Sequence, residues 1–145
     1  MLKNIPPLLG PELLATLRAM GHGDEIVIAD ANFPAAFLGP RLIRTDGIPA
    51  TDMLDAILTV MPLDDFVEEA AFGMQVVGDP DARQPIYDLF EQIIRRHEPA
   101  MGLARIERFA FYDRARQAAA IVQTGENRLY GNVILKKGII RPAAS

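Results

Sequence analysis

The segment Met20-Gly-His-Gly-Asp-Glu-Ile-Val-Ile-Ala-Asp30 decides the fold. Its second half, residues 25–30, is a short apolar run with β-branched residues, bounded by glycine on one side and Asn32-Phe33-Pro34 on the other. Such a run is typical of a buried strand. Glycines on both sides of His22 allow a sharp turn that exposes the imidazole at a loop tip. The sequence therefore predicts a central strand with a histidine before it and an aspartate at its end.

Outward from this segment, apolar spacing predicts the remaining elements. Helices are expected over 11–20, 51–61 with Thr51 as the N-cap, 84–97 and 112–118. Strands are expected over 42–44, 72–77, 104–109, 120–124 and 132–136. This alternation predicts an α/β fold: a single layered domain over residues 1–145, with a mixed, largely parallel sheet flanked by helices. The short connection between the last two strands predicts that part of the sheet is antiparallel.

Composition excludes several classes of protein. Half of the 145 residues are hydrophobic and 23% are charged, which suits one domain with a sizeable core and excludes a disordered chain. The net charge of −4, without a long cluster of Lys and Arg, argues against nucleic acid as a partner. The absence of cysteine excludes disulfides and thiol nucleophiles. We find no signal-peptide pattern and no membrane-spanning stretch, so we expect a cytoplasmic protein.

Imidazole chemistry depends on two residues, His22 and His97. His97 lies on an amphipathic helix without a second histidine nearby, so we expect no metal site. His22 could reach a ligand from its loop, or it could be a helix C-cap that contacts the last carbonyls. Motifs for hydrolase triads, nucleotide hydrolysis and nicotinamide binding do not occur in the sequence.

Each of the other candidate site residues could have a ligand-binding role or a purely structural one. Asp30 could accept hydrogen bonds from sugar hydroxyls, or form an Asx-turn with Asn32. Arg108 and Tyr112 could face a cleft near a strand-to-helix junction, or serve as an ion-pair residue and an interfacial aromatic. In the turn 130–132, the glycine could let the backbone approach a ligand, or the turn could be an ordinary hairpin. Asp64 could point inward from an acidic stretch that otherwise forms a solvated face.

Taken together, these segments resemble the family of L-fucose mutarotases and D-ribose pyranases, the RbsD/FucU family. The resemblance runs from about residue 1 to 140, and only about 78–102 has no matching motif. Seven segments carry it: Met20–Ile26, Ala29–Pro34, Ile43–Gly47, Arg108–Ala115, Thr124–Glu126, Tyr130–Asn132 and Lys136–Gly138.

The resemblance implies an isomerase that interconverts the anomers of L-fucose by acid–base ring opening, without a cofactor, and with D-ribose as a second sugar. It implies His22 as the acid, with Tyr112, Tyr130 or a water held by Asp30 handling the second proton. Substrate binding is implied for Asp30, Asp64, Met74, Arg108, Tyr130, Gly131 and Asn132. Ribose pyranases have a histidine in place of Tyr112, which favours the fucose branch. Asn32 stands where some bacterial fucose members have a histidine, which leaves the fine sugar preference open.

The alternatives are a D-ribose pyranase, a non-catalytic monosaccharide-binding protein, and a structural ring subunit. Family members form decamers of two pentamers, so the resemblance also implies a homo-oligomer. The distance between two candidate residues also bears on whether subunits share a pocket. Eight residues of extended chain could separate His22 from Asp30 by up to roughly 26 Å. Either the His22 loop curls over a strand that begins later, or adjacent subunits complete each pocket. We expect a pocket at or near a subunit boundary.

Overall fold

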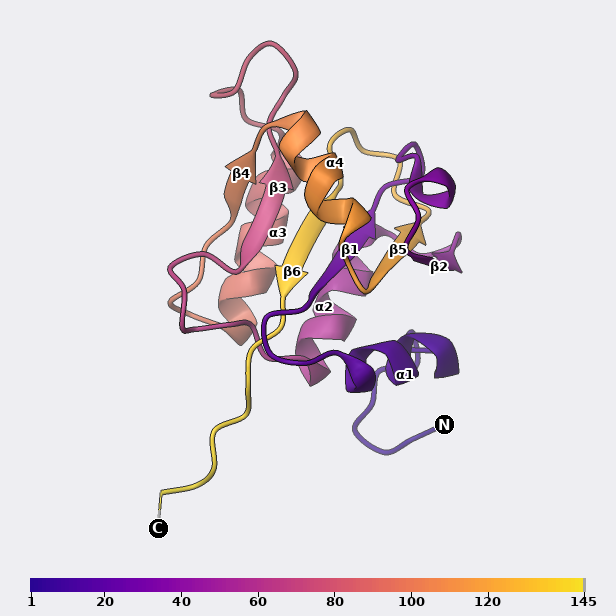
Figure 1. Cartoon of the computed structure of the whole chain (residues 1–145), viewed down its shortest axis with the longest axis vertical. Coiled ribbons are helices and arrows are strands. Elements are labelled where there is room, and N and C mark those ends of the chain that lie inside the picture. Colours follow the sequence, from indigo (N-terminus) through magenta and orange to yellow (C-terminus); the bar gives the residue numbers. More distant parts are fainter. Residues whose placement is uncertain (145) are drawn as a thin grey trace.

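The computed structural model describes residues 1–144 and contains one six-stranded sheet with helices on both faces (Figure 1). In the order β2-β5-β1-β6-β3-β4, the pairs β2/β5, β5/β1 and β3/β4 are parallel. Strand β6 runs antiparallel to both of its neighbours, β1 and β3. The predicted mixed, largely parallel sheet is confirmed, although the antiparallel strand does not pair with β5. The strands are β1 (Glu25–Ala29), β2 (Arg41–Thr45), β3 (Ala71–Met74), β4 (Ala104–Ile106), β5 (Ala120–Thr124) and β6 (Val133–Lys136).

The helices cover the two faces of the sheet unequally. One core cluster joins the sheet to α1 (Pro11–Ala19), α2 (Ala50–Val60) and α3 (Pro85–His97). The other joins it to α4 (Arg108–Arg116), which crosses the opposite face in Figure 1. Alternate residues of β1 belong to the two clusters, and this explains its uninterrupted apolar run. Among residues 1–144, no helix has both the length and the apolar character needed to cross a membrane.

Helix caps account for the largest differences from the sequence prediction. Helix α4 begins at Arg108 rather than near residue 112, because the Glu107 carboxylate accepts hydrogen bonds from the N–H groups of Phe109 and Ala110. Strand β4 accordingly ends at Ile106. Thr51 lies inside α2, whose N-cap is Pro49, so its predicted capping role is wrong. Strand β3 ends at Met74, three residues earlier than predicted.

The pairing of β1 with β6 positions the candidate residues. Glu25 lies opposite Lys136 and Ile28 lies opposite Val133. The start of β1 lies toward α1 and the C-terminus, and its end lies toward the loop that joins β5 to β6 (Figure 1). His22 and Asp30 therefore occupy opposite ends of this strand pair.

Candidate functional site

Asp30 and Asn132 form a buried pair where β1 ends and β6 begins. The Asp30 N–H donates to Asn132 Oδ1 at 2.7 Å, and Asn132 Nδ2 donates to Asp30 Oδ2 at 3.2 Å. The Asn32 N–H donates to Asp30 Oδ1 at 3.0 Å, which is the expected Asx-turn. Each carboxylate oxygen keeps acceptor capacity beyond these bonds. The Asx-turn therefore orients the carboxylate and leaves part of its acceptor capacity free.

The surroundings of Asp30 determine its charge state. Burial raises the pKa of Asp30 above its ordinary value of 3.8, while hydrogen bonds from main-chain N–H groups and from Asn132 oppose that rise. A carboxylate with little competing water interacts strongly with hydroxyl donors. This position is suited to holding sugar hydroxyl groups.

The turn before β6 is held in an unusual backbone conformation. Tyr130 has a φ of 60°, which a bulky residue rarely adopts, and its hydroxyl oxygen accepts a hydrogen bond from the Val77 N–H at 3.0 Å. A Cβ on Gly131 would lie 2.7 Å from Glu126 Cγ and 3.1 Å from Ile86 Cδ1. Glycine is therefore needed here for the packing of Glu126, and the role of this turn in approaching a ligand stays a prediction.

Arg108, Tyr112 and Met74 border the same end of the sheet. Arg108 lines a cavity of about 120 Å³ with the segment 75–78, which includes the residue bonded to Tyr130. Within residues 1–144, Arg108 Nε is buried without a hydrogen-bond acceptor, an arrangement that proteins rarely leave unused. Tyr112 packs on Phe33 with ring centroids 5.5 Å apart. Met74 is buried, and its carbonyl accepts the Tyr87 hydroxyl at 2.6 Å. We call Asp30, Arg108, Tyr112, Tyr130 and Asn132 the Asp30 end.

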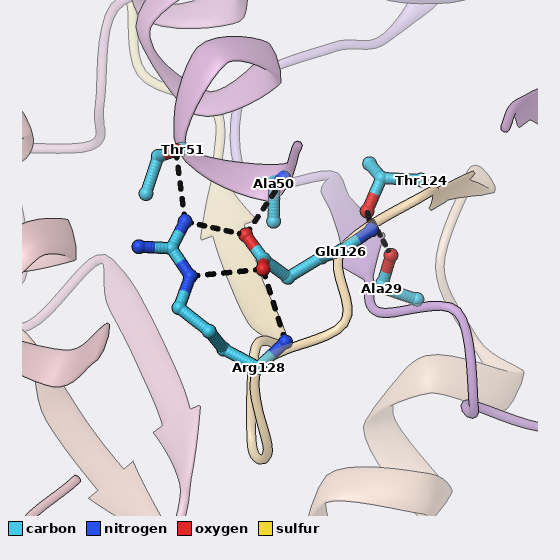
Figure 2. Close-up of polar contacts among 6 residues, drawn as sticks. All are labelled: Ala29, Ala50, Thr51, Thr124, Glu126 and Arg128. Carbon is cyan, nitrogen blue, oxygen red and sulfur yellow. Dashed lines mark hydrogen bonds and ion pairs between the residues drawn. The ribbon is translucent and has the colours of Figure 1, made fainter. Parts of the chain in front are cut away.

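An ion pair between the buried Glu126 carboxylate and the partly exposed Arg128 supports the loop between β5 and β6 (Figure 2). Glu126 accepts from Arg128 Nη2 at 2.8 Å, from Arg128 Nε at 2.9 Å and from the Ala50 N–H at 3.2 Å. Its main-chain oxygen accepts from the Ala31 N–H at 2.9 Å, and Thr124 Oγ1 donates to the Ala29 carbonyl at 2.8 Å.

This network fixes the residues on both sides of Asp30 to the loop that carries Tyr130. In the sequence, Glu126 stood out only through the Thr124-Gly-Glu motif, and no role was predicted for it. One signal in the sequence could have identified Glu126: it is a carboxylate that soon follows a predicted strand and precedes a Tyr-Gly-Asn turn.

The second candidate group lies at the other end of β1. His22 Nε2 lies 2.9 Å from Asp64 Oδ1; the histidine side chain is 41% exposed and the aspartate side chain 4%. The hydrogen bond from His22 lowers the pKa of Asp64 below its ordinary value of 3.8, although burial opposes this effect. The ring of Phe66 lies 5.0 Å from that of His22. We call His22, Asp64 and Phe66 the His22 end.

These contacts decide two alternatives left open by the sequence. His22 is not the C-cap of α1, because that position belongs to Met20. Asp64 points inward, whereas Asp65, Glu68 and Glu69 of the same stretch are exposed. Among residues 1–144, no cluster of three His, Asp or Glu side chains could hold a metal ion.

The candidate residues thus form two groups on one chain. The five residues of β1 alone separate the groups by roughly 13 Å along the strand. The strand begins where it was predicted, so the His22 loop does not curl over its far end.

Comparisons with known proteins identify the family of the chain. Residues 3–140 match the model of the RbsD / FucU transport protein family. The chain belongs to this family. It is 49% identical to human fucose mutarotase over 145 residues, covering 96% of this chain and 94% of the human protein.

Two solved structures of the family resemble the fold. A fucose mutarotase from Streptococcus pneumoniae, solved in complex with L-fucose, is 45% identical, with a TM-score of 0.89 and coverage of 97% of this chain and 100% of that one. Bacillus subtilis RbsD, solved with D-ribose, has a TM-score of 0.74 at 23% identity, again over 97% and 100% of the two chains. At 23% identity, the likeness to Bacillus subtilis RbsD shows the fold alone.

Replacing Glu126 by Gln tests the network in Figure 2. We expect the free energy of unfolding to fall by about 2 kcal/mol, because the buried Glu126 carboxylate loses its charge-assisted bonds to Arg128. Glu91→Gln is the matched control: Glu91 also accepts from an arginine and from a main-chain N–H, but at a more exposed site. The control should lose less than about 1 kcal/mol. Equal losses in urea unfolding would contradict the structural role assigned to Glu126.

Asp64→Asn should show a pH-dependent loss of stability. Because the folded-state pKa of Asp64 lies below 3.8, the ionised carboxylate stabilises the fold above that pH, and this contribution disappears as pH falls through the folded-state value. The difference in unfolding free energy between wild type and variant should therefore shrink between about pH 5 and pH 2. Denaturant titrations across this range measure it. A difference that stays constant or grows toward acid pH would show that His22 does not stabilise the charged form.

Proposed function

We propose that this protein is an L-fucose mutarotase, which interconverts the α and β anomers by opening and reclosing the sugar ring. The observation that carries the proposal is the pairing of the His22 imidazole with the buried Asp64 carboxylate. The relatives named fucose mutarotase, with identities of 45% to 49%, supply the substrate class.

Asp64 prepares His22 for proton transfer. A carboxylate only accepts hydrogen bonds, so Nε2 carries the hydrogen in this pair and Nδ1 is the nitrogen that exchanges a proton with the sugar. This assigns Asp64 to orienting the acid, a different role from the sugar contact implied by the resemblance.

The Asp30 end binds the sugar. The buried carboxylate of Asp30 accepts hydroxyl hydrogens, and the unpartnered Nε of Arg108 offers a donor to a hydroxyl or ring oxygen. Tyr130 has its hydroxyl oxygen engaged by Val77, so its hydrogen is free to point at a ligand. Asn132 is fixed by Asp30 and lines the same end. Met74 contributes apolar surface.

The chemistry requires only proton transfers. Imidazolium protonates the endocyclic oxygen while a base removes the proton of the anomeric hydroxyl; the C1–O5 bond breaks and the C1=O1 bond forms. Rotation about C1–C2 and the reverse transfers close the ring on the other face. General acid–base assistance contributes about 10² to 10⁴-fold. Tyr112, Tyr130 or a water on Asp30 serves as the base, and no cofactor is required.

A single chain does not bring these groups together, so we propose that each site combines the Asp30 end of one subunit with the His22 end of a second copy. Exposed apolar side chains at both ends support this. Phe66 and Ile140 are 62% and 80% exposed near His22, and Phe109 and Leu129 are 61% and 64% exposed near the Asp30 end.

Contact between two different surfaces of the same chain is heterologous, and repeated contacts of this kind close into a ring when the rotation between subunits closes, and otherwise form an open filament. We therefore propose a cytoplasmic homo-oligomer built from rings, in agreement with the decamer of two pentamers that the resemblance implies.

His22→Ala tests the proposed acid. Anomeric exchange of L-fucose, followed by NMR saturation transfer, should be accelerated by the wild-type protein and should fall about 10² to 10⁴-fold toward the uncatalysed rate in the variant. L-Fucose should still bind to the variant. D-Ribose, measured in parallel, separates this proposal from a ribose pyranase. Wild-type protein that leaves exchange unchanged would identify a sugar-binding protein without catalysis.

Mixing two inactive variants tests the shared site. His22→Ala and Asp30→Asn subunits should each be inactive alone, whereas an equimolar co-assembled mixture should regain about one quarter of wild-type activity, because that fraction of sites receives both intact groups. Co-expression with two affinity tags yields the mixed oligomer. A mixture as inactive as either parent would place both groups in the same chain.

A further inference from the structure

The loop that carries His22 begins where α1 ends, and a distant lysine occupies that helix terminus. Lys137 Nζ donates to the carbonyl oxygens of Leu17, at 2.7 Å, and of Met20. The last carbonyls of a helix lack intrahelical partners and carry a partial negative charge, so an ammonium group there is favourable. The sequence left His22 as a candidate for contacting these carbonyls, but in the structure Lys137 makes the contact.

The main chain of Lys137 holds the other side of the same loop. Its carbonyl accepts from the Gly23 N–H at 2.8 Å, and its N–H donates to the Asp24 carbonyl at 2.9 Å. Gly23 has a φ of +89°, as the sharp turn requires. One residue thus fixes the loop on both sides of His22, through its side chain before it and through its backbone after it.

The segment 136–138 also carries the partner of His22. The Asp64 N–H donates to the Lys136 carbonyl at 3.0 Å, and the Gly138 N–H donates to the Pro62 carbonyl at 2.8 Å. A Cβ on Gly138 would lie 2.3 Å from the Leu63 oxygen, so only glycine permits this contact. The extension of β6 therefore lies between the His22 loop and the Asp64 segment and bonds to both.

We propose that Lys137 is a positioning residue for His22: its ammonium group locks the end of α1 so that the imidazole stays on Asp64. The inference rests on the proposed mutarotase function and adds a residue to it. Lys137 touches neither reacting atom and acts through the loop. Substitution of the side chain leaves its main-chain hydrogen bonds in place, so the ammonium group can be tested separately.

Lys137→Met keeps a long apolar stem and removes the donor. We expect kcat for L-fucose exchange to fall about 10-fold, because a small displacement of a reacting group is costly. KM should stay within about twofold, since sugar binding belongs to the Asp30 end. Arg95→Met is the matched control, because Arg95 Nε donates to the Met101 carbonyl just past the end of α3 and the same charge is lost.

A restored ammonium group distinguishes positioning from general damage. The protein contains no cysteine, so Lys137→Cys introduces a unique thiol. Alkylation of this thiol with 2-bromoethylamine in denaturant, followed by refolding, attaches an ammonium group at nearly the length of lysine. We expect the unmodified Lys137→Cys variant to resemble Lys137→Met and the alkylated form to regain most of the lost kcat.

A second readout does not depend on catalysis. In sugar-free protein, ¹³C NMR of the Asp64 carboxyl should show its pKa moving toward 3.8 in Lys137→Met, since the hydrogen bond from His22 is the main cause of the depression. Arg95→Met should leave it unchanged. Wild-type kcat together with wild-type Asp64 titration in Lys137→Met overturns the proposal, as does a loss of kcat that alkylation does not restore. If wild-type protein catalyses no exchange, the proposed function fails, and the Asp64 titration alone tests whether Lys137 positions His22.

Discussion

The antiparallel pairing of β6 with β1 is the constraint on which the candidate site depends. Because Glu25 lies opposite Lys136 and Ile28 opposite Val133, each end of β1 meets a polar segment that flanks β6. At one end Asn132 meets Asp30, and at the other the backbone of Lys137 meets the loop of His22. A register shift of one residue would reverse the faces of β6 and disrupt both ends at once.

Two buried carboxylates, Glu126 and Asp30, differ in how their surroundings affect their charge. Glu126 has its pKa lowered chiefly by the hydrogen bond from Arg128, so it stays charged and holds the loop. Among residues 1–144, no cation donates a hydrogen bond to Asp30, and burial raises its pKa. A buried charge stabilised mainly by N–H groups is costly. A bound ligand that donates further hydrogen bonds to the carboxylate would offset this free-energy cost.

The sequence predicted much of the fold, because burial on both faces leaves a clear apolar pattern. Strand β5 and the start of β1 were predicted at the correct residues, and α3 within one residue. The start of α4 was missed because it depends on a side-chain cap at Glu107, which apolar spacing does not reveal. The partners of Asp30 and His22 lie 102 and 42 residues away in the chain, so spacing alone could not pair them. The roles of Glu126 and Lys137 follow from tertiary hydrogen bonds that only the structure specifies.

The separation of the two ends limits how the proposed active site can form. His22, the proposed acid, lies before β1, and Asp30, the proposed sugar-binding group, lies at its end, so the two cannot approach each other without breaking the sheet between them. The Asp30 N–H donates to the Asn132 side chain, and Gly23 and Asp24 bond to the main chain of Lys137, so local loop motion does not bring His22 and Asp30 together. If the proposed roles hold, proton transfer requires a second copy of the chain, and a heterologous contact leaves a terminal subunit with one surface unused unless the assembly closes into a ring. Catalytic activity should then appear with ring closure rather than with folding of the single chain.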